Sequence, residues 1–235
     1  MAAAEPKLES LGSAEDESGF LEFVHSSMFD PNGPKYPKKK LSAKERYTSD
    51  VLLGFSEILM SLDRLEDLAF LVVKAPHGNS RVSKESYLQI LVEAHLNEVY
   101  VLQQRIAKYL KRLVRAFKED PRYETLRDLQ AKALRVVEAA FNPVTAARSS
   151  HVHEWRFRDQ GINRLEMMNS ISRFGPKGLR AYYRSERART YKQWKKTLAE
   201  NYANVEEIVG EWLGALFPLI FDERTGELLV PAKLR

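Results

Sequence analysis

The sequence predicts an all-α fold, an antiparallel helical bundle with an extended N-terminal arm and a short C-terminal β-hairpin. Three observations support this prediction. Apolar residues recur at steps of three and four over several long stretches, which is the period of one helix face. Breaks that contain proline separate these stretches at residues 76, 121, 143 and 176. Strand-like patterning is expected only in the C-terminal tail.

Three segments are expected along the chain. Residues 1–41 are acidic at first, then rich in proline and glycine, and end in a basic run, so we expect an extended or partly disordered arm. An apolar stretch within it, residues 20–29, leaves docking on the body or on a partner open. Residues 42–216 should form the helical domain, and residues 217–235 a tail or hairpin.

Five helices are expected in the helical domain. Ser42 caps the first and Glu45 completes a capping box, while Pro121 opens the third and Asn142-Pro143 stops it. The expected ranges are 42–74, 83–118, 121–141, about 164–174, and from the 175–178 break to about 216. Two short strands around residues 222–226 would form the hairpin.

The composition limits the class of protein. The chain has no cysteine, which excludes disulfides and cysteine chemistry and is compatible with a reducing compartment. No run approaches the roughly 18 apolar residues that a membrane span requires, and the acidic N-terminus is unlike a secretory signal. We therefore expect a cytoplasmic protein with no membrane partner.

The net charge of +5 is unevenly distributed. Residues 1–34 carry one lysine against seven carboxylates, a balance of −6, so the remainder of the chain carries +11. A basic folded part favours a polyanionic partner such as RNA or DNA. The alternative is a solvated surface with a generic excess of cations.

One segment, residues 148–155, groups residue types that can cleave RNA. It contains Arg148, His151 and His153, and two further arginines, Arg156 and Arg158, follow closely. An imidazole with a pKa near neutrality can take a proton from a ribose 2′-hydroxyl or give one to the leaving oxygen, while a guanidinium holds the phosphate. The expected catalytic residues are Arg148 and His153.

The spacing of these two residues raises a geometric problem. On a straight helix, five residues at about 100° each place Arg148 and His153 roughly 140° apart. Two solutions stay open. The helix could begin within the motif, with Ser149 or Ser150 as its cap and Arg148 in the preceding turn. Alternatively, two copies of the chain meet, so that Arg148 of one copy assists His153 of the other.

The pattern Arg-x-x-x-x-His, after two long antiparallel helices, resembles the R-x(4–6)-H motif of HEPN proteins. That resemblance implies a helical bundle over roughly residues 42–216 that dimerises, pairs two motifs and cleaves RNA without a metal, leaving a cyclic phosphate. It also implies a toxin or a phage-defence effector. Two positions depart from the family pattern: Ser149 follows the arginine where Asn, Asp or His is usual, and Trp155 stands where nucleotidylated toxins have tyrosine.

Each site residue also has a bland interpretation. His153 can be an ordinary histidine of the bundle, and His151 is either structural or the true base. Glu154 and Ser149 are supporting candidates. A zinc site formed by His151, His153 and Glu154 lacks a completing ligand at a convincing spacing, so we expect no metal and no cofactor.

A further histidine, His95, lies on the apolar stripe of the second helix, so the sequence favours a core histidine there over a catalytic one. Glu98, three residues later, is its candidate partner.

A second candidate site is the basic stretch 177–196, in which eight cations and one carboxylate alternate with four aromatic residues. Cations can follow a nucleic-acid backbone while aromatic rings stack on bases. Arg180, Arg184 and Arg187 step by four and three, so they are expected to share one face and bind phosphates together. In the alternative, the aromatic residues face the core and the cations face water.

The sequence thus predicts a metal-independent RNA endonuclease that acts as a homodimer, with a regulatory protein partner left open. The alternative is a helical module that binds nucleic acid or protein without cleaving. A purely structural bundle comes third.

Overall fold

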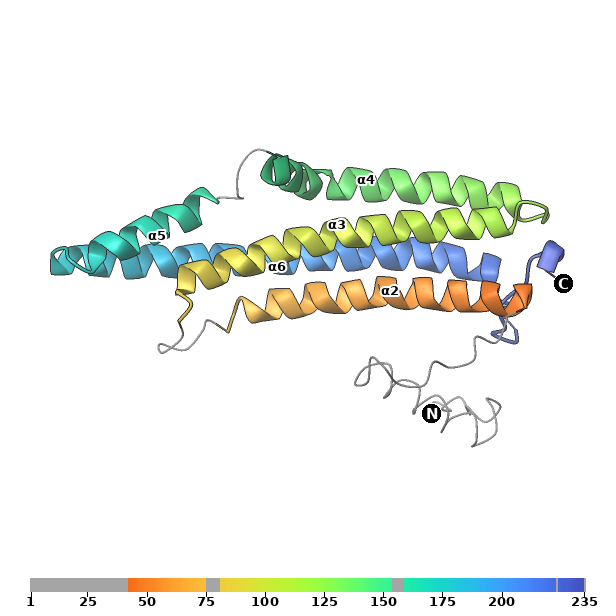
Figure 1. Ribbon diagram of the computed structural model, residues 1–235, viewed down its shortest axis with the longest axis horizontal. Helices are drawn as coiled ribbons and strands as arrows, with labels where there is room; N and C mark the ends of the chain where they lie inside the picture. Colours follow the sequence, from red (N-terminus) through yellow and green to blue (C-terminus); the bar gives the residue numbers. More distant parts are fainter. Residues whose placement is uncertain (1–41, 75–80, 154–158, 223, 235) are drawn as a thin grey trace, which may run out of the picture. The chain divides into compact units, whose positions relative to one another are not determined.

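The computed structural model describes residues 42–74, 81–153, 159–222 and 224–234, and within 143–153 it describes the backbone and the Val144 side chain. Residues 43–235 form one compact unit. The described residues form five α-helices and one short 3-10 helix (Figure 1), which confirms the all-α prediction. The α-helices are α2 (Ala43–Leu71), α3 (Lys84–Ala116), α4 (Tyr123–His153), α5 (Gln160–Ser172) and α6 (Lys177–Ile220), and the 3-10 helix is η1 (Ala232–Leu234).

Four of the helices form a bundle. Figure 1 shows α3 running antiparallel to both α2 and α4, and α2 and α4 each also pack against α6. The shorter α5 lies along the first half of α6 and also contacts α3. Because α6 is the longest helix, it joins the four-helix bundle at its C-terminal half to an α5–α6 hairpin at its N-terminal half.

The apolar stripes predicted from the sequence form the core. The main cluster includes Ile58, Leu102, Ile106, Phe141 and Val209, all almost completely buried and drawn from α2, α3, α4 and α6. A second cluster joins α5 to the bundle through the apolar side chains of Val72, Leu88, Leu91, Val92, Leu96, Ile162 and Leu198. Burial of each large apolar side chain contributes about 1.5–3 kcal/mol, so these clusters are the main stabilising feature of the bundle.

Gly54 sets the approach of α2 to α3. A Cβ atom at this position would lie 2.6 Å from the Tyr109 ring, which is closer than real contacts allow. The ring therefore occupies the space that a side chain would fill. The sequence pattern gives no sign of this contact, since glycine inside a helix reads only as a local weakness.

Most helix boundaries follow the predictions within a few residues. Helix α3 begins one residue after the expected start, because Ser83 caps it and its hydroxyl accepts a hydrogen bond from the Ser86 amide at 3.0 Å. Helix α5 begins earlier than predicted because Asp159 caps it, accepting from the Ile162 amide at 2.8 Å.

The predicted stop of the third helix at Asn142-Pro143 is wrong. Helix α4 continues through Pro143 to His153. A proline within a helix removes one backbone hydrogen bond, here the one that residue 139 would accept. Ala139 is exposed, so water can bind the released carbonyl, while buried Phe141 and half-buried Val144 anchor the helix on both sides of the proline.

The C-terminal tail contains one antiparallel bridge, between Phe221 and Leu228, and no strand among its described residues. The turn between them is closed by a 2.8 Å hydrogen bond from the Gly226 amide to the Asp222 carbonyl, and Gly226 adopts a φ of 70°. Helix α6 continues to Ile220, since Leu216 and Ile220 are both fully buried, and it takes up residues expected in the first strand. The two-stranded hairpin is not confirmed.

The described helices include none that is both long enough and apolar enough to cross a lipid bilayer.

Candidate functional site

The motif residues occupy the end of α4. Arg148, Ser149, His151 and His153 belong to its last helical turns, and their side chains lie outside the described residues. Glu154, Arg156 and Arg158 lie outside the described residues altogether. The structure therefore describes the backbone of the predicted catalytic pair, Arg148 and His153, and not the side chains.

The helical backbone bears on one of the two geometries that the sequence left open. Residues 148–153 are already part of α4, so the expectation that a helix begins within the motif, with Ser149 or Ser150 as its cap, is wrong. The arrangement of two copies, in which Arg148 of one chain assists His153 of the other, stays a prediction.

His95 lies in the core, as the sequence favoured. The residue is fully buried on α3, and neither ring nitrogen has a hydrogen-bond partner among the described residues. Burial lowers the pKa of His95 to about 4. The ring is therefore neutral near pH 7. Because it is fully buried, it belongs to the core and is not accessible to solvent.

Glu98 is engaged elsewhere. Its carboxylate lies 3.5 Å from Arg105 and 3.8 Å from Arg64, so its described ionic partners are these two arginines. Glu98 was predicted to support His95, but neither ring nitrogen of His95 has a hydrogen bond to it. These contacts link α3 to α2 and give Glu98 a structural role.

The basic segment of α6 is held in place by a buried carboxylate that the sequence analysis missed. Glu85, in the first turn of α3, is 1% exposed. It accepts hydrogen bonds from the Tyr183 hydroxyl of α6 and, at 3.1 Å, from the Asn169 amide of α5. Burial, together with the hydrogen bond to Glu85, raises the pKa of Tyr183. Three helices thus meet at one carboxylate.

The three arginines predicted to bind phosphate together do not form one free block. Arg180 donates to the carbonyls of Ser172 and Arg173, at 3.1 and 3.2 Å, and so holds the end of α5. Arg187 is half-buried, stacks on the Tyr183 ring at 5.2 Å and donates to its hydroxyl.

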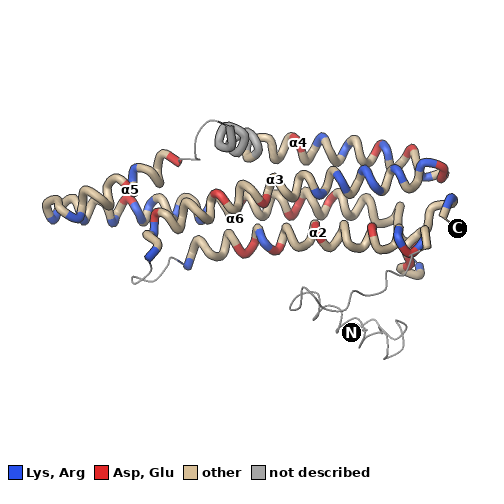
Figure 2. The backbone as a smooth tube through the Cα atoms, viewed as in Figure 1, with Lys and Arg blue, Asp and Glu red and all other residues tan. Residues whose placement is uncertain are grey.

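The exposed cations lie on other parts of α6. The side chains of Arg184, Lys192 and Lys195 are exposed and have no ion pair among the described residues. Figure 2 shows Lys and Arg along the first half of α6. This half carries a charge of +7 over residues 177–196, whereas residues 197–220 carry four carboxylates and no cation.

The aromatic residues of this segment mostly face inward. Tyr183 is buried, and Tyr191 and Trp194 are half-buried against the second apolar cluster. Tyr191 also donates to the Lys84 carbonyl at 2.5 Å. Tyr182 is 47% exposed, and the guanidinium of Arg164 lies over its ring. The core-facing alternative therefore holds for three of the four aromatic residues.

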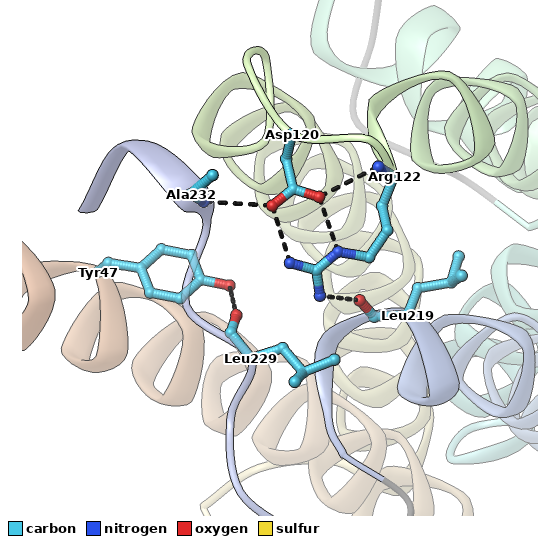
Figure 3. A network of polar contacts seen from close by, with 6 residues as sticks. All are labelled: Tyr47, Asp120, Arg122, Leu219, Leu229 and Ala232. Carbon is cyan, nitrogen blue, oxygen red and sulfur yellow. Dashed lines mark hydrogen bonds and ion pairs between the residues drawn. The ribbon is translucent and has the colours of Figure 1, made fainter. Parts of the chain in front are cut away.

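A second polar network lies where α3 turns into α4 and was not foreseen from the sequence. Figure 3 shows the carboxylate of Asp120 between the Arg122 guanidinium and the Ala232 amide. Arg122 also donates to the Leu219 carbonyl at 3.2 Å, and Tyr47 donates to the Leu229 carbonyl at 3.3 Å. Together these bonds fasten the C-terminal tail to the bundle.

A pocket of about 270 Å³ lies between α2 and α3 near this network. Tyr109, with a hydroxyl that has no described partner, contributes to its wall, as do Arg46 and Arg112. Its described lining includes none of the residues that the sequence predicts for the site.

Metal binding has no candidate among the described residues, where no group of three or more histidine and carboxylate side chains lies close enough together to hold an ion. No protein-family model, curated protein or solved structure was found to match this chain.

Proposed function

We propose that this protein is a metal-independent RNA endonuclease of the HEPN type, in which two copies of the chain bring Arg148 and His153 to one phosphate. The observation that carries the proposal is the position of both residues on the last turns of α4. The role of a toxin or phage-defence effector, which the resemblance implies, is part of the same proposal.

The chemistry requires two groups. His153 takes the proton of a ribose 2′-hydroxyl, and the resulting oxygen attacks the neighbouring phosphorus. The bond from phosphorus to the 5′-oxygen breaks, and that oxygen receives a proton from an imidazolium or from water. Arg148 holds the non-bridging oxygens, on which negative charge develops. The products are a 2′,3′-cyclic phosphate and a 5′-hydroxyl.

Binding of the strand is supported by the first half of α6. Arg184, Lys192 and Lys195 are exposed and can pair with phosphates, and the buried carboxylate of Glu85 fixes the helix that presents them. Each such contact releases counterions, so affinity should fall steeply as salt rises.

The proposal is tested by incubating single-stranded RNA with the full-length chain in excess EDTA and analysing the new 3′ ends. The chain should generate cyclic phosphates, and His153→Ala should abolish them. His151→Ala separates the two histidines of the motif, and His77→Ala is the matched control outside it. RNA that stays intact at high protein concentration would contradict the proposal, as would cleavage that persists in His153→Ala.

A second candidate is a helical module that binds RNA without cleaving it. It is favoured by one observation, the exposed cations of α6, which do not depend on the motif. Salt-sensitive binding of RNA, unchanged by His153→Ala and without new ends, would support this function over the first.

A further inference from the structure

The outer face of α5 carries an apolar stripe. Met167 and Ile171 lie four residues apart on α5 and so share a helix face, and Phe174 follows in the turn after the helix. Their exposed fractions are 59%, 51% and 93%. Buried Leu165 and Met168 pack against Tyr183 of α6. The stripe is therefore additional to the face that anchors α5.

The stripe ends at the turn of the α5–α6 hairpin and lies within a basic region. Residues 167–185 contain four arginine or lysine residues and no carboxylate. Arg173 and Lys177 flank Phe174 at the turn, both are exposed, and neither side chain has an ion pair among the described residues. Figure 2 shows this basic character at the end of the hairpin.

This combination selects among the partners that could cover the stripe. A second copy of the chain would bring cations against cations, and a helix of 13 residues, about 20 Å long, is too short for the roughly 800 Å² per partner of a stable protein interface. RNA would pair with the cations but would gain nothing from Met167 and Ile171, which have no ring to stack on bases.

We infer that the α5–α6 hairpin docks on the surface of an anionic lipid bilayer. Phe174, Ile171 and Met167 enter the boundary between headgroups and acyl chains, and Arg173 and Lys177 pair with the headgroup phosphates and carboxylates.

Tyr182 fits the same orientation. It is half-exposed on the neighbouring turns of α6, and its hydroxyl bonds to the Arg164 guanidinium at 2.5 Å. An aromatic ring with a polar end is well suited to the headgroup region. The expectation of no membrane partner rested on the absence of spanning segments and did not consider docking on a membrane surface.

The experiment is co-sedimentation of the full-length chain with two kinds of vesicle, one of phosphatidylcholine alone and one of phosphatidylcholine mixed with phosphatidylserine. The parent chain should sediment with the mixed vesicles and stay in solution with the neutral ones. Phe174→Glu should lower the partition coefficient by about tenfold or more, because it removes the inserting ring and adds a negative charge. Lys177→Gln should lower it by about fivefold.

Leu53→Glu is the matched control, since Leu53 is 61% exposed on α2 and the charge change is the same. It should bind mixed vesicles as the parent does. Absence of parent binding to mixed vesicles would overturn the inference, and so would undiminished binding by Phe174→Glu. A loss of RNA affinity in Phe174→Glu with vesicle binding unchanged would assign the surface to RNA instead. Cleavage of RNA, which is measured without vesicles, is independent of each outcome.

Discussion

Replacement of Asp120 by asparagine tests the network that fastens the C-terminal tail. The carboxylate accepts four hydrogen bonds, from the Arg122 amide, Nε and Nη2 at 3.1, 2.8 and 2.9 Å, and from the Ala232 amide at 3.2 Å. In Asp120→Asn, an NH2 group, which is a donor, replaces one of the two accepting oxygens. Two of the four N–H donors therefore lose their acceptor. Hydrogen bonds to charged groups contribute about 1.5–3 kcal/mol each, which predicts a loss of about 3 kcal/mol in the free energy of unfolding.

The same residue predicts a pH dependence. Hydrogen bonds from Arg122 hold the pKa of the Asp120 carboxyl well below its usual range. A lowered folded-state pKa stabilises the fold above the unfolded-state pKa of about 3.9, and this stabilisation is lost as the pH falls through the folded-state value. The difference in stability between parent and Asp120→Asn should therefore stay constant between about pH 7 and pH 5 and narrow below about pH 4.

The measurement is urea unfolding followed by far-ultraviolet circular dichroism. Glu119→Gln is the matched control, because Glu119 also contacts the tail, bonding to Lys233 at 2.7 Å, but is 58% exposed. Because the ion pair is exposed, its loss in Glu119→Gln should leave the free energy of unfolding unchanged within error. The explanation is refuted if Asp120→Asn is as stable as the parent, or if Glu119→Gln loses as much.

Two further predictions concern the core and the basic helix. As the pH falls from 7 to 5, His95→Leu should become more stable than the parent, by about 2 kcal/mol at pH 5. The reason is that the buried ring of the folded parent, with its pKa of about 4, stays neutral, whereas the same ring in the unfolded chain binds a proton. Urea unfolding that gives the same pH profile for both chains would contradict this. Replacing Arg184, Lys192 and Lys195 together by glutamine should weaken RNA binding at low salt, as measured by fluorescence anisotropy. The slope of the logarithm of the binding constant against the logarithm of the salt concentration should decrease by the amount expected for about three phosphate contacts. Replacing Arg180 and Arg187 instead should lower stability more than RNA affinity; an equal effect of both variants on affinity would show that the two sets of cations act alike.

The helical fold could be predicted because its signals are local. Steps of three and four in the apolar pattern mark the buried faces of α2, α3 and α4, and Ser83 marks the start of α3. The end of α4 could not be predicted from Pro143, because packing of Phe141 and Val144 offsets the loss of a single backbone hydrogen bond.

The polar interior could not be predicted because it depends on tertiary pairing. Spacing placed Arg180, Arg184 and Arg187 on one face, but it gave no information on which partner lies opposite. Arg180 reaches the end of α5, and Arg187 reaches Tyr183, which itself binds Glu85 almost one hundred residues away in the sequence. One signal of a buried polar contact was present in the sequence, because Glu85, in the first turn of α3, precedes an otherwise apolar helix face.

The pairing of Arg148 and His153 across two copies is tested most directly by mixing chains that each lack one of the two residues. Arg148→Ala and His153→Ala should each be inactive alone. Co-expressed in equal amounts, they should recover about a quarter of the parent's RNA-cleaving activity, because half of the dimers are mixed and each mixed dimer has one intact cleft of two. A mixture that forms dimers yet remains inactive would contradict the shared cleft.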